Sequence, residues 1–220
     1  VLLLPFPITV FSGFFVACSI VNGVNDLFPF ASRLGVSDGA RIWMLLWRPD
    51  LGERWLALLH LGGQLHDGVP PESLSPDFLT KALAVRDASE DTVKANGIAF
   101  SVALHSDKDG EAAERLETCL AFSSYATPGV REALMSDAAV FQARRRNRAD
   151  LAAQWLSEIP TSTPTWLRLR AEAAVLEAQG DVQGAIEKLA EVEALVVALP
   201  NNGQRETLLR SVQRWKADLE

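Results

Sequence analysis

The chain is poor in the residues that mark several common functional classes. Its 220 residues include two cysteines, Cys18 and Cys119, which lie too far apart for a Cys-x-x-Cys metal site and are too few for a disulfide framework. We expect both to be buried free thiols, which fits a reducing compartment. Basic residues number 21 against 28 acidic ones, and the net charge of −7 argues against a nucleic-acid partner.

Motifs for nucleophilic catalysis and phosphate binding are also missing. The sequence contains neither Gly-x-Ser-x-Gly nor a Walker-type loop. His60 and His66 are six residues apart, with Gly62-Gly63 between them, so they cannot share a helical face as His-x-x-x-His does. No segment alternates apolar and polar residues over a sustained stretch, so the predicted fold class is all-α.

Charge is absent from the first 24 residues, Val1 to Val24. This length is enough to cross a hydrocarbon core, which needs about 20 apolar residues. Pro5 and Pro7 interrupt its beginning, so we expect a transmembrane helix from about Ile8 to Phe28. A signal peptide would need a basic start, which is lacking. A buried core helix remains the alternative.

The flanks of this segment set its orientation. No basic residue precedes it, whereas Arg33, Arg41 and Arg48 follow closely, which places the remainder in the cytoplasm. Gly39–Leu61 has apolar residues at helical spacing, interrupted at Pro49. Its tryptophans, Trp43, Trp47 and Trp55, favour an interfacial helix, although they could also fill a core.

A linker follows, marked by Gly62-Gly63 and Gly68-Val69-Pro70-Pro71. It predicts a membrane segment over residues 1–70 and a second domain over 71–220. The second domain contains a repeated pattern in which a small residue follows a turn and a leucine lies one helical turn later. Its three copies are Asp107-x4-Ala112-x3-Leu116, Asn147-x4-Ala152-x3-Leu156 and Gly180-x4-Ala185-x3-Leu189.

The physical need behind this pattern is a close helix pair. Alanine lets two helices approach, Gly or Asn permits a left-handed turn residue, and leucine fills the core. The last copy resembles a tetratricopeptide second helix, and pairs of about 34 residues stack into a solenoid. We expect helix pairs near 90–124, 128–158 and 163–198, then a capping helix near 203–219 with Trp215 packed inward.

One motif carries a resemblance to a known family. Asn25-Asp26-Leu27-Phe28-Pro29, followed by Ser37-Asp38-Gly39, resembles the second metal-binding motif of site-2 protease-type intramembrane zinc metallopeptidases. The resemblance implies that Asp38 is a zinc ligand, supported by Asn25, Asp26, Pro29, Ser37 and Gly39. From the residues alone, Ser37 or Asp38 simply caps the helix that starts at Gly39, and capping and metal binding can coexist.

The rest of the chain is similar to the cytoplasmic helical-repeat tails of some bacterial members. The run Met135–Ala143 and the helix Leu167–Ala174 follow the Ser-Asp-Gly motif in the same order. The His-Glu-x-x-His that supplies two zinc ligands and the general base in this family is absent. Together with the Val at position 1, this favours a fragment or a truncated gene.

Two functions follow as expectations. The first is the C-terminal part of a membrane-embedded zinc metalloprotease-like protein, inactive alone, with a protein substrate. The alternative is a membrane-anchored helical-repeat module that binds a protein partner without catalysis. The basic run Arg144-Arg145-Arg146 could contact anionic lipid headgroups or simply end a solvated helix.

Overall fold

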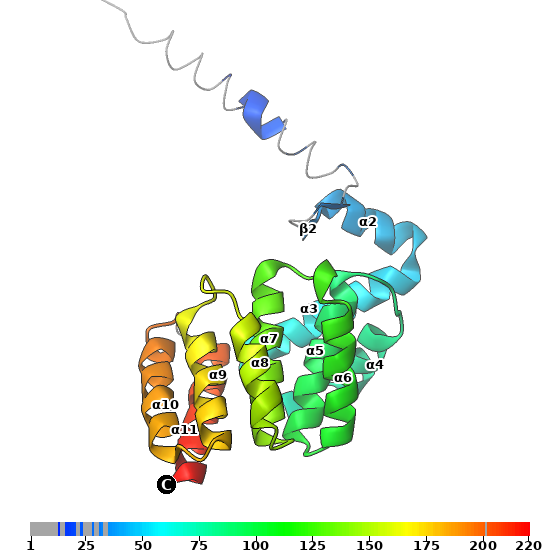
Figure 1. The fold of residues 1–220 in the computed structure, drawn as a ribbon. Helices are drawn as coiled ribbons and strands as arrows, with labels where there is room; N and C mark the ends of the chain where they lie inside the picture. Colours follow the sequence, from blue (N-terminus) through cyan, green and yellow to red (C-terminus); the bar gives the residue numbers. More distant parts are fainter. Residues whose placement is uncertain are drawn as a thin grey trace, which may run out of the picture. The chain divides into compact units, whose positions relative to one another are not determined.

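Over the residues that the structure describes, the fold is all-α apart from one short antiparallel ladder, as the sequence predicts (Figure 1). A computed structural model of the chain describes residues 13, 16–20, 23, 28, 31–32, 35–200 and 202–220. The ladder joins β1 (Ala31–Ser32) and β2 (Gly35–Val36). The helices that follow are α2 (Asp38–Trp47), α3 (Pro49–His66), η1 (Pro71–Ser73), α4 (Pro76–Leu83), α5 (Glu90–His105), α6 (Asp109–Ala121), η2 (Ser123–Tyr125), α7 (Pro128–Arg144), α8 (Ala149–Glu158), α9 (Thr165–Ala178), α10 (Val182–Val197) and α11 (Gly203–Leu219).

The chain forms two compact units, Val1–Glu53 and Arg54–Glu220, which divide within α3. The functional boundary expected at residue 70 stays a prediction. Most of the predicted transmembrane segment lies outside the described residues, and those described there (13, 16–20 and 23) are helical. Within the described part of the chain, no helix combines the length and apolar character that a bilayer crossing requires.

The three predicted helix pairs are confirmed as α5/α6, α7/α8 and α9/α10. Each pair turns at the first residue of the repeated pattern, and this residue has a positive φ in every copy: 54° at Asp107, 51° at Asn147 and 87° at Gly180. A backbone hydrogen bond closes each turn, such as the Asp181 N–H to the Leu176 carbonyl at 2.9 Å. The short turns return each second helix against its partner.

The alanines of the pattern are buried within the helix pairs. Ala112, Ala152 and Ala185 are all fully buried, and Leu116 and Leu189 of the same pattern are buried beside them. Successive pairs fill successive clusters of the core, and Ser136 in α7 donates a 2.9 Å hydrogen bond to the Leu167 carbonyl of α9. Each pair therefore packs mainly on its neighbours.

The prediction that a linker starts at Gly62-Gly63 is wrong. Gly62 and Gly63 lie inside α3, which continues to His66. Glycine weakens a helix by only about 1 kcal/mol per residue, and the apolar face of α3, including the buried Leu58 and Leu61, holds the helix together through this point. The helix ends where Gly68 takes a φ of 82° and the Val69 N–H bonds the Gln64 carbonyl at 2.9 Å.

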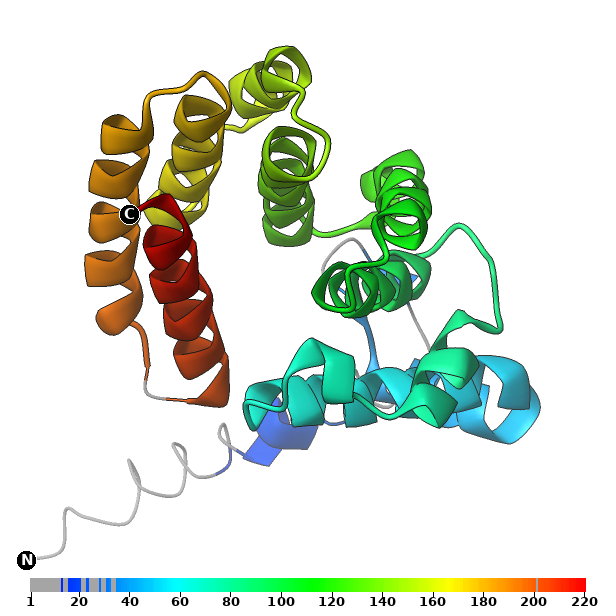
Figure 2. The same cartoon turned by 90° about the horizontal axis from the view of Figure 1, so that it is seen from below.

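The last helix returns to this linker. A Cβ placed on Gly203 would lie 2.2 Å from the Gly68 nitrogen, so the two backbones touch in a way that only glycine allows. Figure 2 shows the helix pairs following a curve, with α11 on its inner side. Trp215 is buried against the α7–α10 core, which confirms its predicted inward packing.

The repeat packing predicts a position-dependent response to volume. We expect Ala185→Leu to lower the free energy of unfolding by about 1–3 kcal/mol, because the site has no room for three more carbons. Ala194→Leu, at an exposed position of the same helix, is the matched control and should change stability by less than about 0.5 kcal/mol. Urea unfolding followed by circular dichroism measures both. Equal losses for the two variants would contradict the close-packing role of Ala185.

Candidate functional site

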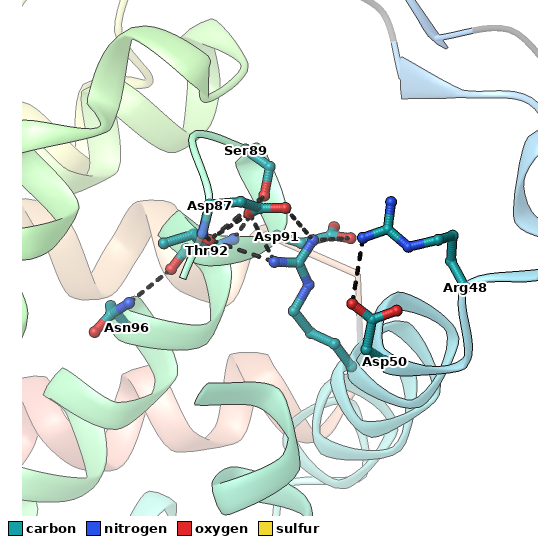
Figure 3. Close-up of polar contacts among 8 residues, drawn as sticks. Arg48, Asp50, Asp87, Ser89, Asp91, Thr92 and Asn96 are labelled. Carbon is teal, nitrogen blue, oxygen red and sulfur yellow. Dashed lines mark hydrogen bonds and ion pairs between the residues drawn. The ribbon is translucent and has the colours of Figure 1, made fainter. Parts of the chain in front are cut away.

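A buried arginine ties α3 to the start of α5. Arg54 is 3% exposed, and its guanidinium pairs with both Asp87 carboxylate oxygens at 2.7 and 3.2 Å. Asp91 lies 3.7 Å away, and the Thr92 hydroxyl accepts a hydrogen bond at 3.4 Å. Figure 3 shows the side chains of Asp87, Ser89, Asp91 and Thr92 gathered together at the start of α5.

The cluster sits at a helix start because of its local sequence. Ser89 is the N-cap of α5, accepts the Thr92 N–H at 3.3 Å and donates its hydroxyl hydrogen to Asp87. Partial burial works to raise the Asp87 pKa, but hydrogen bonds from Arg54, Ser89 and Thr92 outweigh it and lower that pKa to about 2. The carboxylate is therefore charged near neutrality, and its charge is already matched by Arg54. The pair therefore holds α3 against the start of α5.

The other feature is a cavity of about 370 Å³ on the inner side of the helix pairs. Residues of α5, α7, α9 and α11, with Glu72 from η1, line it. The lining is largely charged, with Asp107, Asp137, Asp218, Arg144, Arg145, Arg170 and Arg214 among its residues. Phe141 and Trp215 lie beneath this charged lining, and each is largely buried in the core. Both signs of charge are present, so the cavity selects neither anions nor cations alone.

Arg144 organises the α11 side of the cavity. Its guanidinium lies 3.1 Å from Glu177 and 3.4 Å from Asp218, and it covers the Trp215 ring at 4.5 Å. The Trp215 indole N–H donates to the same Glu177 carboxylate at 2.7 Å. The cation–π contact and the shared Glu177 acceptor hold Arg144 and Trp215 together.

The remaining arginines of the cavity differ in their pairing. Arg170 bonds Asp137 at 2.7 Å across from α9 to α7, and Arg145 bonds Asp107 at 3.0 Å. Arg214 is exposed and forms no ion pair within the described part of the chain. It is therefore the arginine whose charge a bound molecule can meet most directly.

The predicted metal motif is described only in part. Asn25, Asp26 and Pro29 lie outside the described residues. Ser37 is the N-cap of α2, where its hydroxyl accepts the Ala40 N–H at 3.2 Å and donates to the Phe28 carbonyl at 2.5 Å. Asp38 is the exposed first residue of α2 and Gly39 is buried. Capping by Ser37 is thus confirmed, and the zinc role of Asp38 stays a prediction.

Potential metal ligands do not gather elsewhere in the described chain. Among these residues, no group of three or more His, Cys, Asp or Glu side chains could hold a metal ion. His60 is exposed, and its ring stacks on Phe78 with centroids 3.9 Å apart.

The structure gives the contacts of the basic run Arg144-Arg145-Arg146 and the burial of the two cysteines. Arg144 and Arg145 make the ion pairs given above, and Arg146 lies 5.5 Å from the Phe141 ring centre. Contact of this run with lipid stays a prediction. Cys119 is buried as expected, and burial raises the pKa of its thiol to about 12, whereas Cys18 is half-buried.

Comparison of the chain with family models, curated proteins and solved structures finds no match. The resemblance to site-2 proteases rests on the residues of the motif and the order of the tail alone. Function must therefore be inferred from the geometry of the sites above.

Sequence reasoning missed the Arg54 cluster and the cavity. Ser89-Glu90-Asp91 was legible as a cap, but nothing local links it to an arginine 33 residues upstream of Asp87. The Arg170–Asp137 pair likewise joins different repeats. The available signal was the spacing itself, since Asp137 and Arg170 stand 33 residues apart, about one repeat length.

The cluster predicts a large cost for removing its cation. We expect Arg54→Met to destabilise the protein by about 3 kcal/mol at neutral pH, the low end for a broken buried pair, because the 39% exposed Asp87 can rehydrate. Arg48→Met, which breaks an exposed pair with Asp50, is the control and should cost less than about 1 kcal/mol.

The acid dependence of this loss has a definite sign. The Asp87 pKa is lowered on folding, so its contribution is present above about pH 4 and disappears as pH falls toward 2. The gap between wild type and Arg54→Met should therefore narrow in acid. Chemical unfolding at several pH values measures it, and a gap that is constant with pH would contradict the charge-pairing account.

Proposed function

We propose that this protein is a membrane-anchored helical-repeat module that binds a segment of a partner protein in its inner cavity and performs no chemistry of its own. The observation that carries the proposal is the cavity, which α5, α7, α9 and α11 jointly line with charges of both signs around Phe141 and Trp215. Small-molecule pockets are predominantly apolar. A peptide segment with mixed charges and an apolar side chain fits this lining better.

A bound peptide would exchange its own charged groups for the present ion-pair partners of the cavity arginines. Arg144, Arg145 and Arg170 are already paired with acidic groups, so a ligand gains specificity by matching this pattern and only modest affinity from each pair. Arg214 offers an acidic group of the ligand a first contact. Arginine is one of the residue types that most often dominate binding energy.

The finer architecture belongs to the same proposal. The uncharged N-terminal sequence spans the membrane with a helix from about Ile8 to Phe28, the stretch Gly39–Leu61 follows at the interface, and the pairs from α5 onward form a tetratricopeptide-like repeat domain on the cytoplasmic side. The uncharged N-terminal sequence and the arginines after it support the anchor and its orientation. The repeated left-handed turns and buried alanines support the repeat assignment.

Site-specific photo-crosslinking tests the cavity. With a benzophenone amino acid at Ser211, an exposed residue of the lining, we expect an adduct with a partner protein in the source cells. Arg214→Glu should weaken it more than about tenfold, because like charges in an interface cost several kcal/mol. Arg86→Glu, exposed and outside the lining, is the matched control. An adduct that forms equally from Ala194 on α10, or that ignores Arg214→Glu, would refute the proposal.

A second candidate function is that of a chain of a site-2-type zinc metalloprotease. One observation supports it. Ser37 caps α2, so the exposed Asp38 carboxylate at the helix start is not needed for capping and can serve as a ligand. The His-Glu-x-x-His of that family would have to come from a segment that this sequence lacks. Residues 1–220 alone are then expected not to hydrolyse peptides.

Metal content tests this candidate. If Asp38 ligates zinc, the protein isolated from its source membranes contains zinc, and Asp38→Asn loses most of it. Asp50→Asn, at the exposed start of α3, is the matched control and should keep the metal. Elemental analysis by mass spectrometry gives the zinc-to-protein ratio. Zinc-free wild-type protein, or a ratio that Asp38→Asn leaves unchanged, would eliminate the metalloprotease reading.

A further inference from the structure

One helix presents apolar side chains to solvent over most of its circumference. In α2, the side chains of Ile42, Trp43, Leu45, Leu46 and Trp47 are 47%, 45%, 40%, 64% and 64% exposed. The Trp43 and Trp47 rings stack, with centroids 6.4 Å apart and planes at 22°. Exposed apolar surface of this extent marks a binding surface rather than ordinary solvent contact.

The angular spread of these side chains narrows the choice of partner. At about 100° per residue, the five exposed positions cover an arc of about 200°. A helix that packs on a protein core needs a stripe of about 100°. A groove of one partner protein would leave much of this surface in water, whereas a lipid layer can surround it.

The length and the ends of the run indicate how it would lie. Six apolar residues, Ile42 to Trp47, extend about 9 Å at 1.5 Å per residue, far less than a bilayer crossing. Arg41 and Arg48 stand at the two ends. Indole rings favour the headgroup level, where one face is apolar and the N–H reaches water.

We propose that α2 docks in the headgroup layer of the membrane, with the stacked Trp43–Trp47 pair as its anchor. The inference rests on the proposed membrane anchoring, since the uncharged Val1–Val24 stretch would bring α2 to the bilayer. The positive charges of Arg41 and Arg48 are balanced by the negative charges of Asp38 and Asp50, so this segment carries no net charge. The docking is therefore driven by apolar burial and does not require anionic lipid.

Depth-dependent quenching tests the docking in the full chain reconstituted in phosphatidylcholine vesicles. The chain has six tryptophans. Subtracting the fluorescence of a Trp43→Phe/Trp47→Phe variant from that of the wild type gives the emission of this pair alone. We expect lipid brominated near the headgroup to quench this difference emission about twofold, and more than lipid brominated at the chain end, because indoles settle at the interface. The quenching should be the same when phosphatidylserine is added and when salt is raised.

The controls separate this proposal from the anchoring on which it rests. Trp166→Phe, half-buried in the repeat unit, should yield a difference emission that brominated lipid leaves unchanged. If the protein floats with the vesicles but the pair is not quenched, the docking is refuted and the anchor stands. Blue-shifted, unquenched emission of the pair would instead assign α2 to a protein surface, either this chain's or a second copy's. Failure to float would overturn both proposals.

Discussion

Close approach of two helices at a buried alanine is the constraint on which the repeat unit depends. Ala112, Ala152 and Ala185 have no accessible surface, and a larger side chain at any of them would push a helix pair apart. The approach requires the chain to reverse within a few residues, which the left-handed Asp107, Asn147 and Gly180 allow. Asp and Asn tolerate this conformation better than other side chains, so the turn is possible without glycine in two copies.

This spacing determines where charge can be placed. Because consecutive pairs stack on one another, some of their inward positions meet, and Arg170 of one pair reaches Asp137 of the previous one at 2.7 Å. The glycine contact between residues 68 and 203 then brings α11 to the inner side, where Asp218 reaches Arg144. The cavity is thus a product of two separate requirements, the repeat period and the return of the last helix.

The sequence was informative wherever the determining contacts are local. Caps, turns and the alanine pattern act over a few residues, so the helix pairs and the inward Trp215 were predictable. The glycines at 62 and 63 misled because α3 is held by its tertiary contacts through Leu61, which outweigh propensity. The Arg54–Asp87 and Arg144–Asp218 pairs join residues 33 and 74 positions apart, and no short-range pattern reports such contacts.

Pre-paired charges also bear on what the cavity can recognise. An arginine left unpaired inside it would attract any anion, and selectivity would be low. With Arg144, Arg145 and Arg170 satisfied by acids of the same chain, a ligand must offer both signs in matching places to compensate the pairs that it disturbs. Under the proposed function, the exposed Arg214 is expected to contribute to the rate of encounter more than to discrimination. Specificity in such a site comes from the pattern of charges held by the repeats, and the net charge of −7 says little about it.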